Sequence, residues 1–219
     1  MRKHKLYSIW SAVPVTYYQK GVKGNLFQRV WHTQKINLAT RIIKDIKFKN
    51  CLDVGCAIGY MLNQIQKAFP EKKYIGVDVY DKAIKFAQKS YPEISFKIAA
   101  ADKLPFKDNS FDLSLCYETI EHVEDPEGCL KEIKRVLKKG GVLILAMDSG
   151  NWMFRIVWFI WEKTTGKVWD GAHLHPFNHH ELEQIILKSG FKMNKFSDSP
   201  IKQKLFSHHG MEVVFVLKK

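Results

Sequence analysis

Short apolar runs alternate along the chain with segments whose apolar residues recur at helical spacing. The runs at residues 74–79, 111–117 and 142–147 predict buried strands. Residues 127–138 have the helical period and precede Gly140 and Gly141, which predicts a helix that ends at these glycines. Alternating strands and helices predict a parallel sheet with right-handed crossovers, and such sheets bind ligands at the carboxyl ends of their strands.

A glycine turn follows the first predicted strand, in the sequence LDVGCAIGYML of residues 52–62. Glycines before a helix favour an anion site, because the backbone can approach the ligand and the first helical N–H groups are unpaired. The dinucleotide fingerprint would need glycines in place of Ala57 and Tyr60, and no Gly-Lys-Ser/Thr of a P-loop follows. What is present is Asp53 two residues before Gly55, with Gly59 four residues later. An acid there repels phosphate and favours a cationic ligand head, such as an ammonium.

Three segments together resemble the class I S-adenosylmethionine-dependent methyltransferases. The first is the glycine turn with Asp53. The second is a strand that ends in Asp78, 25 residues after Asp53 (78 − 53), near the spacing of about 20 residues at which an acid binds ribose hydroxyls. The third is Asp102 in the sequence ADKLPF of residues 101–106. The resemblance implies that Asp78 binds the ribose and that Asp102 receives the adenine amino group, while the Ala101 region contacts the ring.

The resemblance also implies a fold, a cofactor and a set of contacts. The fold would be a Rossmann-like α/β fold with a seven-stranded, mostly parallel sheet, one antiparallel strand and helices on both faces. A hairpin of residues 191–197 and 211–217 would supply the antiparallel strand. The cofactor would be S-adenosylmethionine, with S-adenosylhomocysteine as product and no metal. The implied cofactor contacts are Asp53, Gly55, Cys56, Ala57, Gly59, Asp78, Val79, Ala101, Asp102, Lys103 and Tyr117.

The length of 219 residues and the hydrophobic content of 46% are enough to bury one substantial core, so we expect a single domain. We expect four parts within it. Residues 1–48 would form an N-terminal helical cap, residues 49–148 the cofactor-binding core, residues 149–176 an aromatic insertion or lid, and residues 177–219 a helix and a hairpin.

Candidate catalytic residues follow the strand of residues 111–117. The sulfonium cofactor is an activated methyl donor, so the protein mainly has to hold the nucleophile about 3 to 3.5 Å from the methyl carbon and exclude water. An oxygen or nitrogen acceptor can also need a base. We predict Glu118 and His122 as catalytic residues; a purely structural role for His122 is an equal alternative. Glu121 and His122 are adjacent, so they cannot both point at one acceptor.

The segment of residues 151–161 is almost continuously apolar and aromatic, and is too short to span a bilayer. Four tryptophans lie in or near it, and tryptophan favours the boundary between apolar and wet surroundings. We expect a lid that shapes an apolar acceptor site and touches the membrane as an interfacial helix. A helix packed onto the body of the domain is the alternative. An apolar or lipid-linked acceptor is therefore favoured, and a soluble small molecule or RNA stays open.

The net charge of +13 indicates an acidic partner, either an anionic membrane surface or nucleic acid. The lysines are dispersed, so a solvated basic surface is the alternative, and nucleic acid is not favoured. A non-enzymatic module that binds RNA or a membrane is the competing function. Asp53, Asp78 and Asp102 argue against it, because such a module has no physical need for three acids at these spacings. The sequence does not indicate an oligomeric state.

The histidines and cysteines are interpreted as structural. His173, His175, His179 and His180 resemble a metal cluster, but a capping box at residues 178–181 starts a helix whose first turn separates the last two side chains. His173 or His175 is more plausible as an acceptor contact. The four cysteines have no metal-type spacing and indicate buried residues in a reducing compartment. We therefore expect a cytoplasmic protein with peripheral membrane contact.

Overall fold

The computed structural model describes residues 14–16, 24–148, 156, 159–160, 163, 175, 177, 179–193, 203–205 and 212–219. The helices are α3 (Leu26–Lys44), α4 (Tyr60–Ala68), α5 (Asp81–Ser90), α6 (Pro126–Val136) and α8 (His179–Lys188), with a 3-10 turn η1 at Ile120–His122. The strands are β1 (Asn50–Val54), β2 (Lys73–Asp78), β3 (Ser95–Ile98), β4 (Phe111–Tyr117), β5 (Leu137–Asp148), β6 (Lys192–Met193), β7 (Gln203–Leu205) and β8 (Glu212–Lys218).

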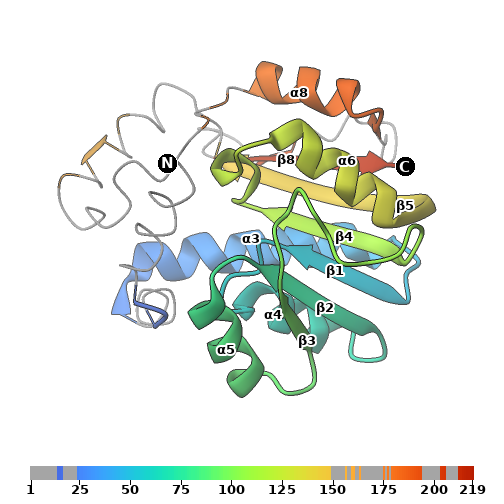
Figure 1. The fold of residues 1–219 in the computed structure, drawn as a ribbon. Coiled ribbons are helices and arrows are strands. Elements are labelled where there is room, and N and C mark those ends of the chain that lie inside the picture. Colours follow the sequence, from blue (N-terminus) through green and yellow to red (C-terminus); the bar gives the residue numbers. More distant parts are fainter. Residues whose placement is uncertain are drawn as a thin grey trace.

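The strands form one sheet in the order β3-β2-β1-β4-β5-β8-β6, and β7 pairs with β8 (Figure 1). Strands β1 to β5 are parallel to one another, and β8 runs antiparallel to β5. The mostly parallel sheet with one antiparallel strand is therefore confirmed. The expected seven strands are the main path of the sheet, and β7 is an eighth that the sequence pattern did not predict. The expected late hairpin corresponds to β6 and β8, which pair antiparallel.

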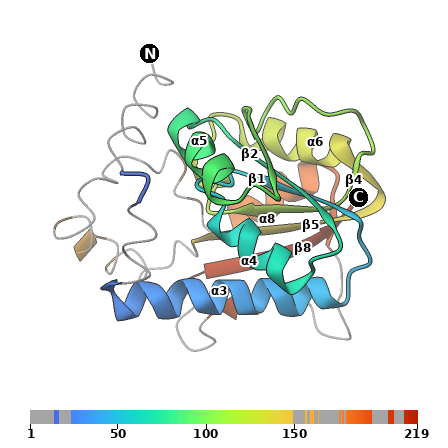
Figure 2. The same cartoon turned by 90° about the horizontal axis from the view of Figure 1, so that it is seen from below.

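Both faces of the sheet are buried. Along β5, Val142, Ile144 and Ala146 lie in one hydrophobic core, and the residues between them lie in the other. Helices α3, α4 and α5 contribute to the first core, whereas α6 and α8 contribute to the second. Figure 2 shows α3 and α6 on opposite sides of the strands. A strand covered on both faces has no polar side, which is why residues 142–147 of β5 form a continuous apolar run in the sequence.

Helix α6 ends earlier than the glycine signal predicts. It stops at Val136, and Leu137 is already extended, with φ −69° and ψ 142°. The amides of Asn109 and Ser110 donate to the carbonyls of Arg135 and Val136 at 3.1 and 2.7 Å. These hydrogen bonds satisfy the last helical carbonyls. Leu137 is buried and begins β5, so tertiary pairing ends the helix before Gly140 is reached.

Asp112 ties the start of β4 to its two neighbouring strands. Its Oδ2 accepts from the backbone amides of Lys49 and Asn50 at 3.0 and 2.9 Å, and its Oδ1 accepts from Lys138 Nζ at 2.8 Å. Burial opposes its ionisation, but these hydrogen bonds outweigh burial and lower its pKa below the ordinary 3.8. The carboxylate therefore fixes the end of the sheet opposite the carboxyl ends of the strands.

We expect Asp112→Asn to lower the free energy of unfolding at neutral pH by about 1 to 2 kcal/mol, because the neutral amide loses charge-assisted hydrogen bonds. The pKa of Asp112 is lower in the folded than in the unfolded chain, so its stabilisation is present above pH 3.8 and is lost as the pH falls through the folded value. Urea titrations followed by circular dichroism over this range would measure the difference. A difference that grows toward acid pH would contradict this role.

Candidate functional site

The glycine turn folds over the end of β2. The amides of Gly55 and Cys56 both donate to the carbonyl of Val77, at 2.8 and 3.0 Å. Gly55, Ala57 and Gly59 have φ values of 79°, 46° and 73°, all in the left-handed region. A Cβ at Gly55 would overlap the Thr119 side chain, so this position needs glycine. Ala57 adopts the same kind of conformation without being glycine, at a cost of about 1 to 2 kcal/mol.

Asp78 compensates for this strain by joining the turn to the end of β2. Its Oδ2 accepts from the Ala57 amide at 2.8 Å, and its Oδ1 accepts from the Tyr80 amide at 2.9 Å. Burial raises the pKa of Asp78, although the hydrogen bonds from the amides of Tyr80, Ala57 and Val79 lower it. A carboxylate has about four lone-pair positions, so Asp78 keeps capacity to accept from ligand hydroxyls. Val79 follows directly and is exposed.

Asp53 lies on β1 beside β2 and is 4% exposed. Burial, and then the charge of Asp78, raises the pKa of Asp53 to about 7. Two carboxylates therefore share a poorly solvated region near the carboxyl ends of neighbouring strands. A cationic ligand group would favour ionisation of both acids, whereas phosphate would be repelled. Cys56 is buried against Gly76 of β2, so only its backbone can contact a ligand.

The loop after β3 continues the same edge of the sheet. The amide of Ala99 donates to the carbonyl of Asp78 at 3.0 Å, which places the end of β3 beside the end of β2. The amide of Lys103 then donates to the carbonyl of Ala100 at 3.1 Å and closes a tight turn. Asp102 and Lys103 are exposed in this turn, and Ala101 is partly buried. The turn thus presents the predicted adenine contacts at the edge where the two acids lie.

Glu118 follows β4 and forms an ion pair with a lysine of α3. Its φ of 47° is left-handed and costs about 1 to 3 kcal/mol, and its amide donates to the Ala146 carbonyl at 2.9 Å. Its Oε1 accepts from Lys35 Nζ. The Lys35 side chain is 4% exposed, and its ammonium lies 4.8 Å from the Trp31 ring centroid. Tyr117, also a predicted cofactor contact, is partly buried against the first core.

The charges around this ion pair set its protonation. Burial opposes ionisation of Glu118, but the Lys35 ammonium, and then His32 and His122, outweigh burial and lower its pKa below the usual value. Burial, and then the charge of Lys35, lowers the pKa of His32 to about 4, so this imidazole is neutral at neutral pH. Sequence patterns did not identify Lys35 as a site residue. The sequence does contain one indication, because Lys35 is a charged residue at a position where α3 should be apolar. It lies four residues after Trp31 and three before the buried Leu38, on the same side of the helix.

The second predicted catalytic residue, His122, ends the turn η1. Its amide donates to the Thr119 carbonyl at 2.9 Å, and its side chain is partly buried. Glu121 is 4% exposed, and its carbonyl accepts from the His175 amide at 3.1 Å. The His175 ring stacks on Phe177, with ring centroids 5.2 Å apart. His175 therefore lies next to η1, whereas His173 and the predicted cap at residue 178 lie outside the described residues.

Within the described part of the chain, no three His, Cys, Asp or Glu side chains gather as a metal site would require. The arrangement instead combines a glycine turn, one buried and one partly buried acid, and a polar loop at the carboxyl ends of β1 to β4. That is where Rossmann-like sheets bind nucleotides. Asp78 offers acceptor capacity for hydroxyls, and Asp53 favours a cation. The fold and the site define a Rossmann-like protein suited to a nucleoside that carries a positively charged group.

Comparisons with known proteins identify the family. A family model for a methyltransferase domain matches residues 52–145. An uncharacterized methyltransferase of Schizosaccharomyces pombe is 33% identical over 138 residues, which cover 57% of this chain and 49% of that protein. An uncharacterized protein of Methanocaldococcus jannaschii is 31% identical over 150 residues, covering 68% of this chain and 69% of that protein. The chain thus spans about half the length of the yeast relative.

A solved structure agrees with these sequence relatives. An S-adenosylmethionine-dependent methyltransferase of Thermotoga maritima superposes with a TM-score of 0.64 at 25% identity, covering 92% of this chain and 98% of that one. The chain belongs to the class I S-adenosylmethionine-dependent methyltransferase family. The resemblance of the three motifs is therefore confirmed at the level of the family, and S-adenosylmethionine is the cofactor of that family.

We expect Asp78→Asn to weaken binding of S-adenosylhomocysteine by at least about tenfold, equivalent to about 1.4 kcal/mol. An amide oxygen replaces only one of the two acceptors, and the new NH2 group faces a backbone N–H donor. Isothermal titration calorimetry measures the affinity. Asp81→Asn is the matched control, because Asp81 is nearby but pairs with the exposed Lys85 at 2.9 Å. Equal affinities for Asp78→Asn and the unsubstituted protein would refute the assignment.

Proposed function

We propose that the protein transfers a methyl group from S-adenosylmethionine to an apolar or lipid-linked small molecule at the carboxyl edge of the sheet. The observation that carries the proposal is the pair of acids, buried Asp53 and partly buried Asp78, at the ends of neighbouring strands beside the glycine turn. Two acids at this position favour a ligand that carries both a pair of hydroxyls and a positive charge. A nucleoside sulfonium with an ammonium group combines these features.

The chain's own residues then divide the work of binding. Asp53 faces the ammonium, Asp78 receives the ribose hydroxyls, and the turn of residues 101–103 contacts the adenine. The Ala57 and Gly59 region brings backbone close to the ligand. The bound cofactor supplies a methyl group that is already activated for displacement. The protein therefore mainly fixes the direction and distance of approach and keeps water away.

Glu118 is better suited to binding than to proton abstraction. Its lowered pKa and its ion pair with Lys35 make it a weak base. The pair instead fixes α3 against the end of β4 and forms a polar border beside the cofactor site. His122, one turn further along, is the proposed proton acceptor where the methyl group goes to oxygen or nitrogen.

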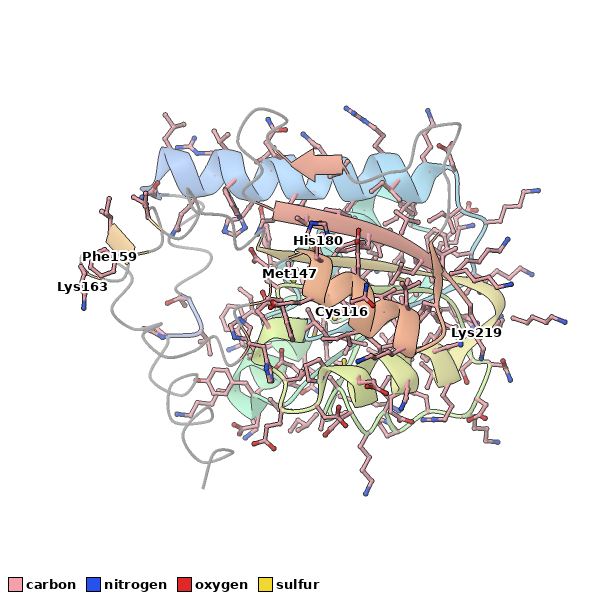
Figure 3. The ribbon with its side chains drawn as sticks, turned by 90° about the horizontal axis from the view of Figure 1, so that it is seen from above. Cys116, Met147, Phe159, Lys163, His180 and Lys219 are labelled. Carbon is pink, nitrogen blue, oxygen red and sulfur yellow. The ribbon has the colours of Figure 1, made fainter. Side chains whose placement is uncertain are left out.

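The preference for an apolar acceptor rests on the described residues of the aromatic segment. Three apolar residues of this segment are helical and exposed: Ile156, Phe159 and Ile160, whose exposed fractions are 51%, 61% and 57%. The last two lie three and four residues after Ile156, so all three share one side of the helix. Lys163 lies over the Phe159 ring, with its ammonium 5.6 Å from the centroid. Figure 3 shows Phe159 and Lys163 beyond the end of β5 that carries Met147, and far from Lys219. Apolar side chains with a lysine suit an interfacial contact with anionic lipid.

The membrane contact would be peripheral. Among the described residues, no helix combines the length and apolarity needed to cross a bilayer. Phe159 and Lys163 lie on the same side of the molecule as the carboxyl ends of the parallel strands (Figure 3). A protein that rests on the cytoplasmic face of a membrane in this orientation would take its acceptor directly from the lipid phase. The net charge of +13 adds a general attraction to anionic lipid, which does not depend on how the protein is oriented.

The raised pKa of Asp53 generates a pH dependence. The pKa of about 7 in the free protein means that the Asp53 carboxyl group is largely protonated below neutral pH. Binding of an ammonium to the carboxylate then requires that this proton be released. We expect the affinity for S-adenosylhomocysteine to rise between about pH 5.5 and about pH 7, with release of up to about one proton per ligand bound at the lower pH. Calorimetry in buffers of different ionisation enthalpy counts the protons. Asp53→Asn should flatten the dependence; an unchanged slope in that variant would exclude Asp53 as its source.

The test of the function uses S-adenosylmethionine labelled on its methyl group, the purified protein and a cell extract. The extract is then separated into organic-soluble, nucleic-acid and small-molecule fractions. We expect label in the organic-soluble fraction, and less of it with Asp53→Asn or Asp78→Asn when S-adenosylmethionine is below saturation. Label in another fraction would keep the methyltransferase and reject the apolar acceptor. Binding of S-adenosylhomocysteine without label in any fraction would favour a non-enzymatic binding module.

A further inference from the structure

The connection from β3 to β4 contains no helix in residues 99–110. Because the strand order is β3-β2-β1-β4, this connection passes two strands before it enters the sheet again (Figure 1). It carries Ala101, Asp102 and Lys103, which we propose as adenine contacts. Among the described residues, its backbone hydrogen bonds to other elements are made only at its two ends, by the amide of Ala99 and by those of Asn109 and Ser110. Between these ends the backbone bonds are local, such as the one from the Phe106 amide to the Leu104 carbonyl at 2.9 Å. The position of Asp102 must therefore be fixed from outside the loop.

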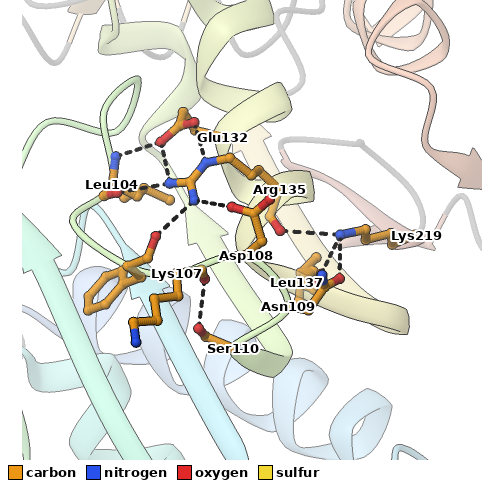
Figure 4. Close-up of polar contacts among 10 residues, drawn as sticks. Leu104, Lys107, Asp108, Asn109, Ser110, Glu132, Arg135, Leu137 and Lys219 are labelled. Carbon is orange, nitrogen blue, oxygen red and sulfur yellow. Dashed lines mark hydrogen bonds and ion pairs between the residues drawn. The ribbon is translucent and has the colours of Figure 1, made fainter.

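Two residues of α6 supply this fixation, as Figure 4 shows. Glu132 Oε2 accepts from the Leu104 amide at 2.8 Å, and Arg135 Nη2 donates to the Leu104 carbonyl at 3.0 Å. Both backbone groups of Leu104 are thus bound by side chains, as a neighbouring strand would bind them. Arg135 Nη1 also donates to the Phe106 carbonyl at 2.8 Å and to Asp108 Oδ1 at 2.7 Å.

The pair is itself held in place. Arg135 donates to Glu132 twice, from Nε to Oε1 at 2.7 Å and from Nη2 to Oε2 at 2.9 Å. Their side chains are 32% and 22% exposed, so the pair is shielded from much of the solvent. The end of α6 is fixed by Lys219, whose Nζ donates to the carbonyls of Arg135 and Leu137 at 3.2 and 2.6 Å (Figure 4). The planar guanidinium fork can serve all its acceptors at once, which a lysine cannot do.

Packing directs the loop at the same point. Leu104 is 4% exposed in the second core, and the rings of Phe106 and Phe111 meet edge to face with centroids 5.0 Å apart. Apolar burial holds the loop against the domain, but it does not fix the rotation of its backbone. The bidentate contacts to Leu104 do so, because they constrain its N–H and C=O directions together. Asp102 lies two residues before this constrained backbone.

We propose that Glu132 and Arg135 form a positioning clamp for the adenine-binding loop and so determine recognition of the purine. The inference rests on the proposed function, because it assumes that Asp102 contacts adenine. Neither residue touches the ligand in this proposal. Their effect passes through Leu104 to Asp102, and their loss weakens the purine contact while the ribose and ammonium contacts at Asp78 and Asp53 persist.

The test is a double-mutant cycle in full-length protein, measured by isothermal titration calorimetry with S-adenosylhomocysteine. We expect Arg135→Lys to weaken binding about tenfold in the unsubstituted background and less than about twofold in the Asp102→Ala background. A second ligand, S-inosylhomocysteine, replaces the adenine amino group with a carbonyl, and Arg135→Lys should affect its binding less than about twofold. Lys131→Gln is the matched control, since it removes a positive charge from the exposed face of α6.

The outcomes separate the possible roles of the clamp. Equal losses of affinity in both backgrounds and for both ligands would mean that Arg135 only stabilises the fold, and would overturn the proposal. Glu132→Gln repeats the test if circular dichroism shows that Arg135→Lys is unfolded, and unfolding of both variants would also overturn the proposal. Failure of the unsubstituted protein to bind S-adenosylhomocysteine would refute the proposed function itself. Normal binding with no effect of Arg135→Lys would refute only the clamp.

Discussion

The hydrogen bond from the Ala57 amide to the Asp78 carboxylate joins the ends of two neighbouring strands, and the arrangement of the site depends on it. It holds a turn in which three residues have left-handed backbone conformations. The same carboxylate also receives the Tyr80 amide at the start of α5. Because these donors stabilise a negative charge in a buried place, an acid can remain there and still accept from a ligand. Burial, and then the charge of Asp78, raises the pKa of Asp53 to about 7.

The parts of the fold that were predictable from the sequence have local causes. A stretch of strand buried on both faces must be continuously apolar, as residues 142–147 of β5 are. The left-handed residue that lies against the Thr119 side chain must be glycine, as Gly55 is. The acids at residues 53 and 78 lie at the carboxyl ends of their strands, and the acid at residue 102 follows the next strand. Because these strands are parallel, the three positions predicted one common edge. The predicted end of α6, at residue 138, was wrong by two residues, because the helix ends at Val136. The amides of Asn109 and Ser110 donate to its last carbonyls in place of the next helical amides. Such competition between distant segments leaves no local pattern.

The ion pair of Lys35 and Glu118 was beyond sequence reasoning for a related reason. A lysine on the apolar stripe of a helix shows that something polar must meet it, but not which residue does. The partner lies 83 residues away, at the end of β4, in a backbone conformation that glycine usually adopts. Both features point in the same direction. The fold accepts a strained residue, a buried lysine and a partly buried glutamate at the place where α3 meets the cofactor edge. Such exceptions to local rules concentrate at functional sites.

The clamp on the β3 to β4 connection shows how a loop can gain the precision of a strand. A helix in this connection would have fixed its path through internal hydrogen bonds, and a strand would have done so through pairing with a neighbour. Residues 99–110 have neither, and yet Leu104 has both backbone groups bound by Glu132 and Arg135. The connection is therefore free to carry ligand contacts at Asp102 while α6 sets its position. Recognition of the purine would then depend on a helix that lies on the face of the sheet and does not itself contact the ligand.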